Sequence, residues 1–255
     1  MSRRSLSVPA LLALLVLSGC GSTSKSTPSG PAAATTTAGG SSAVQGTDDR
    51  AIARAGVLRL SDLPAGWTAG PRGHESTPAQ IKNEAAACMH VSPALLAEPQ
   101  PNEVQSPKFK DRAISASVEN SVAVGPTEAT ASAYLRALGE SQAPACLSSA
   151  FEKELEKSLS REAKKLPHGV SIGKLAVGTI PFPAEGSAHA AYRITLPITL
   201  NGVTVASYYI DAVLVQVGRA YMSMTFQASG APLSSSIEEG LSKAAVGRLQ
   251  KALGQ

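Results

Sequence analysis

Residues 192–203 read YRITLPITLNGV, and this stretch decides the fold. From 192 to 200 an apolar Tyr, Ile or Leu occupies every second position, which is the period of a strand with one buried face. Asn201-Gly202 follows, and this dipeptide is the strongest short signal for a two-residue β-hairpin. The stretch therefore predicts two neighbouring antiparallel strands.

The sequence after the hairpin continues the meander and closes it with a helix. Residues 203–217 form the next predicted strand, and the turn Gly218-Arg219 leads into a strand at 220–229. We interpret Met222 and Met224 of that strand as core residues and not as a cofactor pocket. Ser235 and Glu238 then have the spacing of a capping box. The apolar face of the helix that they introduce consists of Ile237, Leu241, Ala245, Leu249 and Leu253.

The elements before the hairpin complete the predicted fold. Residues 112–124 form a strand that places Asn120 on its buried face, where this side chain needs hydrogen-bond partners. Residues 169–179 form a weaker strand. Helices are predicted over residues 78–88, over residues 126–138 and after Pro144. The order indicates an α+β fold, in which an antiparallel meander sheet carries helices packed on one face as a two-layer sandwich.

The first twenty residues have the layout of a bacterial export signal. Basic Arg3-Arg4 precedes an apolar run at 8–17 that is shorter than the roughly 20 residues of a membrane-spanning helix. Residues 17–20 read LSGC, which resembles the lipobox of bacterial lipoproteins. The resemblance implies cleavage before Cys20, diacylglycerol on its thiol, an acyl group such as palmitate on its amino group, and a place on the extracytoplasmic face of the cell membrane. The alternative is an ordinary cleaved signal in which Cys20 is incidental.

The composition divides the chain into three parts. Residues 1–19 form the signal, residues 20–47 hold the lipidated Cys and a stretch of almost only Ser, Thr, Gly, Ala and Pro, and residues 48–255 form one domain. Such a stretch buries too little apolar surface to fold, so we expect a flexible tether. Loss of Arg3 and Arg4 with the signal lowers the net charge from +4 to +2, which is no nucleic-acid-binding signature.

Two cysteines remain after Cys20. Because Cys88 and Cys146 would lie in an oxidising compartment, an even pair indicates one disulfide. A catalytic thiol or a metal ligand is the alternative, but neither Cys belongs to a Cys-x-x-Cys motif. Trp67 follows the turn residues at 62–66, and we interpret it as a core residue rather than a ligand contact.

The whole mature chain resembles a group of actinobacterial envelope lipoproteins and the extracellular sensor domains of mycobacterial serine/threonine kinases of the PknH type. The resemblance rests on the lipobox, the tether, the 62–67 segment, the Cys88 and Cys146 pair, and the closing meander and helix. It implies a helix-backed antiparallel sheet with a ligand cleft and no known catalysis. The kinase sensor domains carry two disulfides, whereas this chain can form one.

The sequence contains residues that match parts of known catalytic motifs, but the predicted structure around them does not suit catalysis. Ser171 and Lys174 have S-x-x-K spacing, but the segment is predicted to be a strand and the companion motifs of penicillin-binding enzymes are missing from the sequence. The four His residues are far apart in sequence. They are His74, His90, His168 and His189. We expect no catalytic residue, metal or cofactor.

The helix after Pro144 has a sorted row of charges. Its basic residues recur every four positions at Lys153, Lys157, Arg161 and Lys165. A solvated helix face explains this row, and a strip that contacts anionic lipid headgroups or wall polymers is the alternative.

Two function classes follow from these observations. We favour a non-enzymatic binding or sensing module on the membrane, which takes an envelope ligand such as a lipid or a cell-wall component into a cleft between sheet and helices. The alternative is a cell-wall hydrolase or another envelope enzyme whose site is assembled only in the fold. The sequence does not identify the ligand, a protein partner or an oligomeric state.

Overall fold

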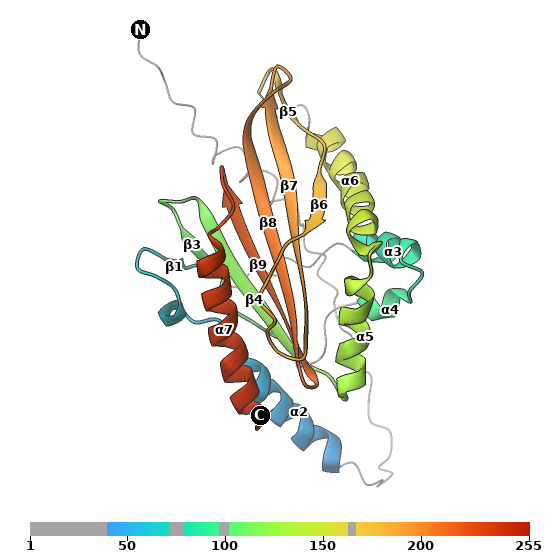
Figure 1. The fold of residues 1–255 in the computed structure, drawn as a ribbon, viewed down its shortest axis with the longest axis vertical. Helices are drawn as coiled ribbons and strands as arrows, with labels where there is room; N and C mark the ends of the chain where they lie inside the picture. Colours follow the sequence, from blue (N-terminus) through green and yellow to red (C-terminus); the bar gives the residue numbers. More distant parts are fainter. Residues whose placement is uncertain (1–39, 72–78, 97–101, 163–166) are drawn as a thin grey trace, which may run out of the picture.

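A long antiparallel meander forms the centre of the protein (Figure 1). The computed structural model describes residues 40–71, 79–96, 102–162 and 167–255, and only the backbone for 40–47 and 157–162. The strands pair in the order β1-β3-β4-β9-β8-β7-β5, while β2 pairs with β4 and β6 pairs with β7. Their bounds are Thr68–Ala69 (β1), Val104–Gln105 (β2), Phe109–Asp111 (β3), Ala116–Val124 (β4), Val170–Ile172 (β5), Ala176–Thr179 (β6), Ala188–Leu200 (β7), Val203–Val217 (β8) and Ala220–Ser229 (β9). The predicted α+β class and meander are confirmed.

The hairpin between β7 and β8 turns at the predicted dipeptide. Asn201 has φ 51° and Gly202 has φ 81°, so both central residues adopt the left-handed conformation that a type I′ turn requires. A register shift between Ile198 and Thr199 then inserts one extra residue in β8. Beyond this bulge Arg193 lies opposite Asp211, so both side chains point to the same face of the sheet.

Helices pack on both faces of the sheet. The sequence had predicted them on one face only. The helices are α2 (Gly40–Ala55), α3 (Ala79–Cys88), α4 (Pro93–Leu96), α5 (Glu128–Gly139), α6 (Ala143–Glu162) and α7 (Ser235–Ala252), with a 3-10 turn at Leu60–Asp62. Val213 and Val215 of β8 belong to the core beneath α2 and α7, whereas Leu214 belongs to the core beneath α3 to α6. Neighbouring residues of a strand point to opposite faces, so the unbroken buried run Val213–Val217 needs cover on both sides.

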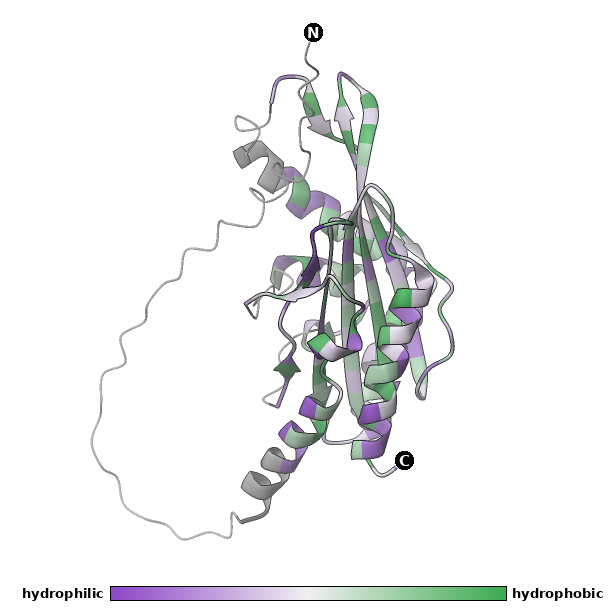
Figure 2. Ribbon diagram, turned by 90° about the vertical axis from the view of Figure 1, so that its left-hand side faces the viewer, coloured by the Kyte–Doolittle hydropathy of each residue, from purple (hydrophilic) through white to green (hydrophobic). Residues whose placement is uncertain are grey.

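The first core lies between the sheet and helices α2 and α7. Met222, Met224 and Phe226 of β9 are fully buried there, and Trp67 joins them at 6% exposure. The interpretation of the two Met residues and of Trp67 as core is therefore confirmed. Figure 2 shows α7, the helix that ends at the C label, along one side of the sheet.

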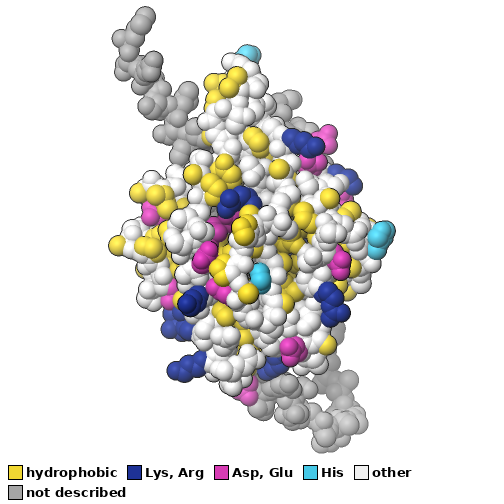
Figure 3. All heavy atoms as spheres, viewed as in Figure 1, with side chains coloured by type: hydrophobic (Ala, Val, Ile, Leu, Met, Phe, Trp, Pro, Cys, Tyr) yellow, Lys and Arg dark blue, Asp and Glu magenta, His cyan; other side chains and the backbone are white. Residues whose placement is uncertain are grey.

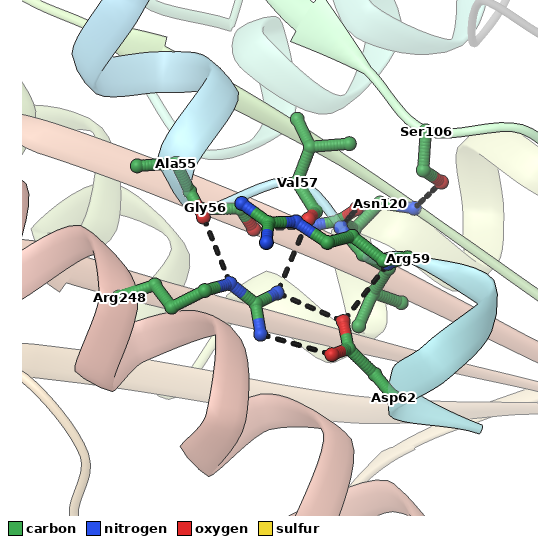
Figure 4. Close-up of polar contacts among 9 residues, drawn as sticks. Ala55, Gly56, Val57, Arg59, Asp62, Ser106, Asn120 and Arg248 are labelled. Atoms are coloured by element: carbon green, nitrogen blue, oxygen red, sulfur yellow. Dashed lines mark hydrogen bonds and ion pairs between the residues drawn. The ribbon is translucent and has the colours of Figure 1, made fainter. Parts of the chain in front are cut away.

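Two polar residues fasten the segment after α2 to this core (Figure 4). Asn120 is 3% exposed; its Oδ1 accepts from the Leu58 N–H at 2.8 Å and its Nδ2 donates to the Gly56 carbonyl at 3.0 Å. These are the partners that the sequence required for a buried amide. Arg248 of α7 donates to Asp62 at 2.8 Å and 3.0 Å and to the Ala55 carbonyl at 3.0 Å.

The remaining predicted elements differ in detail. The strand expected at 112–124 begins at Ala116, and Ile114 before it is 48% exposed. The segment 169–179 divides into β5 and β6, which both pair with β7. Helices α3, α5 and α6 lie where they were predicted.

The signal, Cys20 and the tether up to residue 39 lie outside the described residues. Helix α2 begins at Gly40, so the predicted domain boundary at 48 falls inside this helix. Within the described residues, none of the helices combines the length and the apolar character needed to cross a membrane.

Candidate ligand cleft and buried acidic cluster

A cleft opens between the sheet and the helices of the second core. Its volume is about 190 Å³. Helices α3, α5 and α6 form its walls, and β7, β8 and β9 form its floor. Its lining consists of Ile81, Lys82, Ala85, Leu96, Tyr134, Leu138, Leu147, Phe151, Val177, Tyr192, Ile194, Ala212, Leu214, Ser223, Met224 and Thr225.

The disulfide holds two walls of the cleft together. Cys88 ends α3 and Cys146 lies in the first turn of α6, and their Cα atoms are 5.5 Å apart. The predicted disulfide is therefore present. Because α3 contributes Ile81 and Ala85 to the lining and α6 contributes Phe151, the covalent link fixes the spacing of the walls that face each other.

A few polar groups interrupt the apolar lining. Tyr134 packs against Tyr221 with ring centroids 5.4 Å apart. Burial raises the pKa of the Tyr192 phenol, which keeps this group a neutral donor at the cleft floor. Among the described lining residues the titratable side chains are those of Lys82, Tyr134 and Tyr192, and none is a His, Cys, Asp or Glu. The arrangement suits binding of an apolar group with a few oriented hydrogen bonds.

An acidic cluster lies on the opposite face, beneath α7. Arg193 of β7 donates to both carboxylate oxygens of Asp211, at 2.7 Å and 2.5 Å. Asp211 and Glu238 are each 2% exposed, and Oε1 of Glu238 has no hydrogen-bond partner. Burial, together with the hydrogen bond and negative charge of Asp211, raises the pKa of Glu238 from 4.5 to about 8. At neutral pH the two carboxyl groups therefore hold one proton in most molecules.

The capping box predicted for α7 does not form. The N-cap position is Ser234, whose side chain makes no capping hydrogen bond, and Glu238 faces Asp211 instead of the helix end. Glu185, on the segment between β6 and β7, accepts from the buried Ser242 hydroxyl of α7 at 2.5 Å. Burial raises the pKa of Glu185 as well. One signal for this cluster was present in the sequence, because Asp211 is the single charged residue of the run 203–217.

The other predicted site residues are not gathered in one place. Lys153 is 59% exposed at its side chain and forms an ion pair with Glu84 of α3 at 3.1 Å. The side chains of Lys157 and Arg161 and the whole of Lys165 lie outside the described residues, as does Cys20. Ser171 lies on strand β5, where its hydroxyl pairs with that of Thr199 at 2.6 Å.

The histidines and the surface charges give no sign of a further site. His90, His168 and His189 are exposed, and no group of three His, Cys, Asp or Glu in the described part of the chain is arranged to hold a metal ion. His74 lies outside that part. On the face that carries α7, basic and acidic side chains are interspersed (Figure 3).

Comparisons with known proteins give a likeness at the level of structure and not of sequence. The chain matches no family model and no curated protein sequence. Among solved structures, it is similar to the extracellular domain of PknH from Mycobacterium tuberculosis, at 9% sequence identity and a TM-score of 0.40. The match covers 81% of this chain and 97% of that domain.

Proposed function

We propose that this protein is a lipid-anchored binding or sensing protein of the extracytoplasmic face, and that its cleft takes up an apolar group of an envelope ligand. The observation that carries the proposal is the cleft itself: an apolar space of about 190 Å³ between sheet and helices, with wall helices held by a disulfide. The described lining offers hydroxyls and one Lys, and it contains no His, Asp or Glu.

The size of the cleft limits what enters it. Ligand pockets usually measure about 300 to 1,000 Å³, while an apolar cavity of about 150 Å³ is enough for benzene. A single ring or a short part of an acyl chain therefore fits. Burying about six methylene groups stabilises the complex by about 5 kcal/mol, which corresponds to a Kd in the range of about 0.1 to 1 mM without polar contacts. The remaining part of the ligand lies outside the cleft.

Two independent features support the proposed compartment. The LSGC motif ending at Cys20 supports lipid attachment after export, and the Cys88–Cys146 disulfide suits an oxidising compartment. Two acyl groups on one residue would hold the domain at the membrane essentially permanently. The proposed ligand is accordingly a molecule of the envelope.

The hydrolase alternative has one candidate pair of acids. Asp211 and Glu238 share a proton, and paired carboxyls are the machinery of glycosidases. Both side chains are only 2% exposed at the interface between α7 and the sheet, however, and the Asp211 carboxylate already accepts a hydrogen bond from Arg193. A wall polymer cannot reach this pair while α7 is docked, so the cleft supports binding better than the acids support catalysis.

Binding of a dansylated C11 fatty acid tests the proposal. The full chain with Cys20→Ala, exported and purified without detergent, should bind this probe with saturable fluorescence. Ala212→Phe or Val177→Phe places a ring in the cleft and should weaken binding at least about tenfold, since both residues line it. Val205→Phe, at a site that is already 53% exposed on β8, is the matched control and should leave binding unchanged. Equal binding by all four proteins would refute the proposed function.

A further inference from the structure

The sheet face that floors the cleft changes from apolar to polar across β9 and β4. Leu214 of β8 lies opposite Ser223 of β9, which in turn lies opposite Ser121 of β4. Ala212 lies opposite Thr225 in the same way. We call the side chains that continue this face the polar row. Its members are Ser117, Glu119, Ser121, Ser223, Thr225 and Gln227.

The polar row begins inside the cleft. Ser223 and Thr225 both line it, beside the apolar Ala212 and Leu214. Neighbouring strands are about 4.8 Å apart, so a group anchored in the cleft needs to extend only one or two strand spacings to reach Ser121. A sugar ring is about as wide as one such spacing. The cleft and the row are therefore two halves of one surface, within the reach of a single small molecule.

The row presents groups that both donate and accept hydrogen bonds. The hydroxyls of Ser121 and Ser223 lie 3.1 Å apart, and Gln227 Oε1 accepts from Ser117 at 3.2 Å and from Tyr208 at 2.9 Å. Each hydroxyl has one donor and two acceptor positions, so these contacts leave capacity for a ligand. Ser121, Ser223 and Thr225 are only half-buried, which leaves them accessible to a small molecule.

The charge of the row favours a neutral partner. Glu119 is its one ionisable member. The Lys108 ammonium lies 3.8 Å from Oε1 of Glu119 and compensates its negative charge. A neutral group with several hydroxyls matches Ser, Thr and Gln side chains without the desolvation cost of burying a charge. A sugar has this chemistry.

We propose that the cleft and the polar row together bind an amphiphile with a neutral glycosyl headgroup, its chain in the cleft and its sugar on the row. This inference rests on the proposed function of the cleft. The small volume of the cleft is consistent with it, because the chain alone binds weakly and the headgroup supplies the remaining affinity and the selectivity.

Two probes with the same chain length separate the two halves of the surface. Octyl glucoside carries a neutral sugar and octanoate carries a carboxylate. The affinity of each is measured by its displacement of the dansylated C11 fatty acid from the exported Cys20→Ala chain. Both are used below the concentration at which they form micelles. The wild type should bind octyl glucoside at least about tenfold more tightly than octanoate, as expected when the sugar gains two or more hydrogen bonds.

Substitutions in the row test the assignment of the headgroup. The double change Ser223→Ala and Thr225→Val should weaken octyl glucoside binding about tenfold and weaken octanoate binding much less, because only the sugar is expected to bond to the removed hydroxyls. Thr225→Ser alone keeps the hydroxyl and should retain the affinity, and melting temperatures show whether each variant is folded. Equal loss for both probes, or no loss for the glucoside, would overturn the glycosyl assignment while the cleft proposal stands. Failure of the wild type to bind any of the three probes would overturn the proposed function itself.

Discussion

Replacing Glu238 by Gln removes one titrating proton from the buried cluster while keeping the shape of the side chain. Glu238 is 2% exposed and its Oε1 has no partner, with Asp211, Arg193 and Glu239 as its charged neighbours. The Gln amide still offers a donor to Asp211. The change therefore isolates the cost of ionising Glu238 beneath α7.

The expected effect follows from the raised pKa of Glu238. In the folded protein this pKa is about 8, against an ordinary value of 4.5. Between these values the folded state binds more protons than the unfolded state, so the contribution of Glu238 to stability falls as the pH rises. It is complete below pH 4.5 and lost above pH 8. Each pH unit in this range lowers the free energy of unfolding by about 1.4 kcal/mol. Relative to the Gln variant, the wild type should therefore lose about 3 kcal/mol between pH 4.5 and pH 7.

Urea unfolding at pH 5, 6, 7 and 8 measures this effect as a difference between the two proteins. The Gln variant should have nearly the stability of the wild type at pH 5 and should exceed it increasingly toward pH 8. Titrations of groups outside this cluster cancel in the difference. Glu156→Gln, at an exposed position of α6, is the control for loss of a carboxylate that is not buried. A difference for Glu238→Gln that stays constant from pH 5 to pH 8 would refute the reasoning.

Three further predictions concern stability and surface contacts. Reduction of the disulfide or Cys146→Ser should lower the unfolding free energy by about 4 kcal/mol, since the bond closes a loop of 58 residues; identical urea midpoints with and without reductant would contradict this. Asn120→Ala should cost about 3 kcal/mol in urea unfolding because it leaves two buried backbone groups without partners, whereas Asn83→Ala on the exposed side of α3 should cost little. Changing Lys153, Lys157 and Arg161 together to Gln should reduce cosedimentation with anionic vesicles at low salt and leave the melting temperature nearly unchanged, because the exposed pair of Lys153 with Glu84 contributes little; unchanged cosedimentation would leave only a solvated face.

The capping box shows how a local pattern and a tertiary contact compete. Ser235 and Glu238 have the spacing of a cap, yet Glu238 lies under the helix beside Asp211. A cap depends only on residues within one turn, while the burial of Glu238 depends on how α7 docks on β8. The sequence pattern therefore located the helix and missed the role of its carboxyl.

The division of the helices between two faces had a signal that alternation alone concealed. Val213–Val217 is buried without interruption, which is what a strand covered on both sides requires. Nothing local assigns α2 and α7 to one face and α3 to α6 to the other. The cleft exists only because helices distant in sequence from β8 meet over it, so its lining was beyond the reach of periodicity.

The sequence by itself determined the features that depend on few residues. Asn201-Gly202 set the turn because these residues tolerate positive φ, and two cysteines after Cys20 allowed one disulfide. The tertiary structure alone decided which side chains face each other. A bulge between Ile198 and Thr199 moves the register by one residue and brings Asp211 opposite Arg193. A one-residue shift exchanges the two faces of a strand, and only packing against the rest of the sheet selects between the registers.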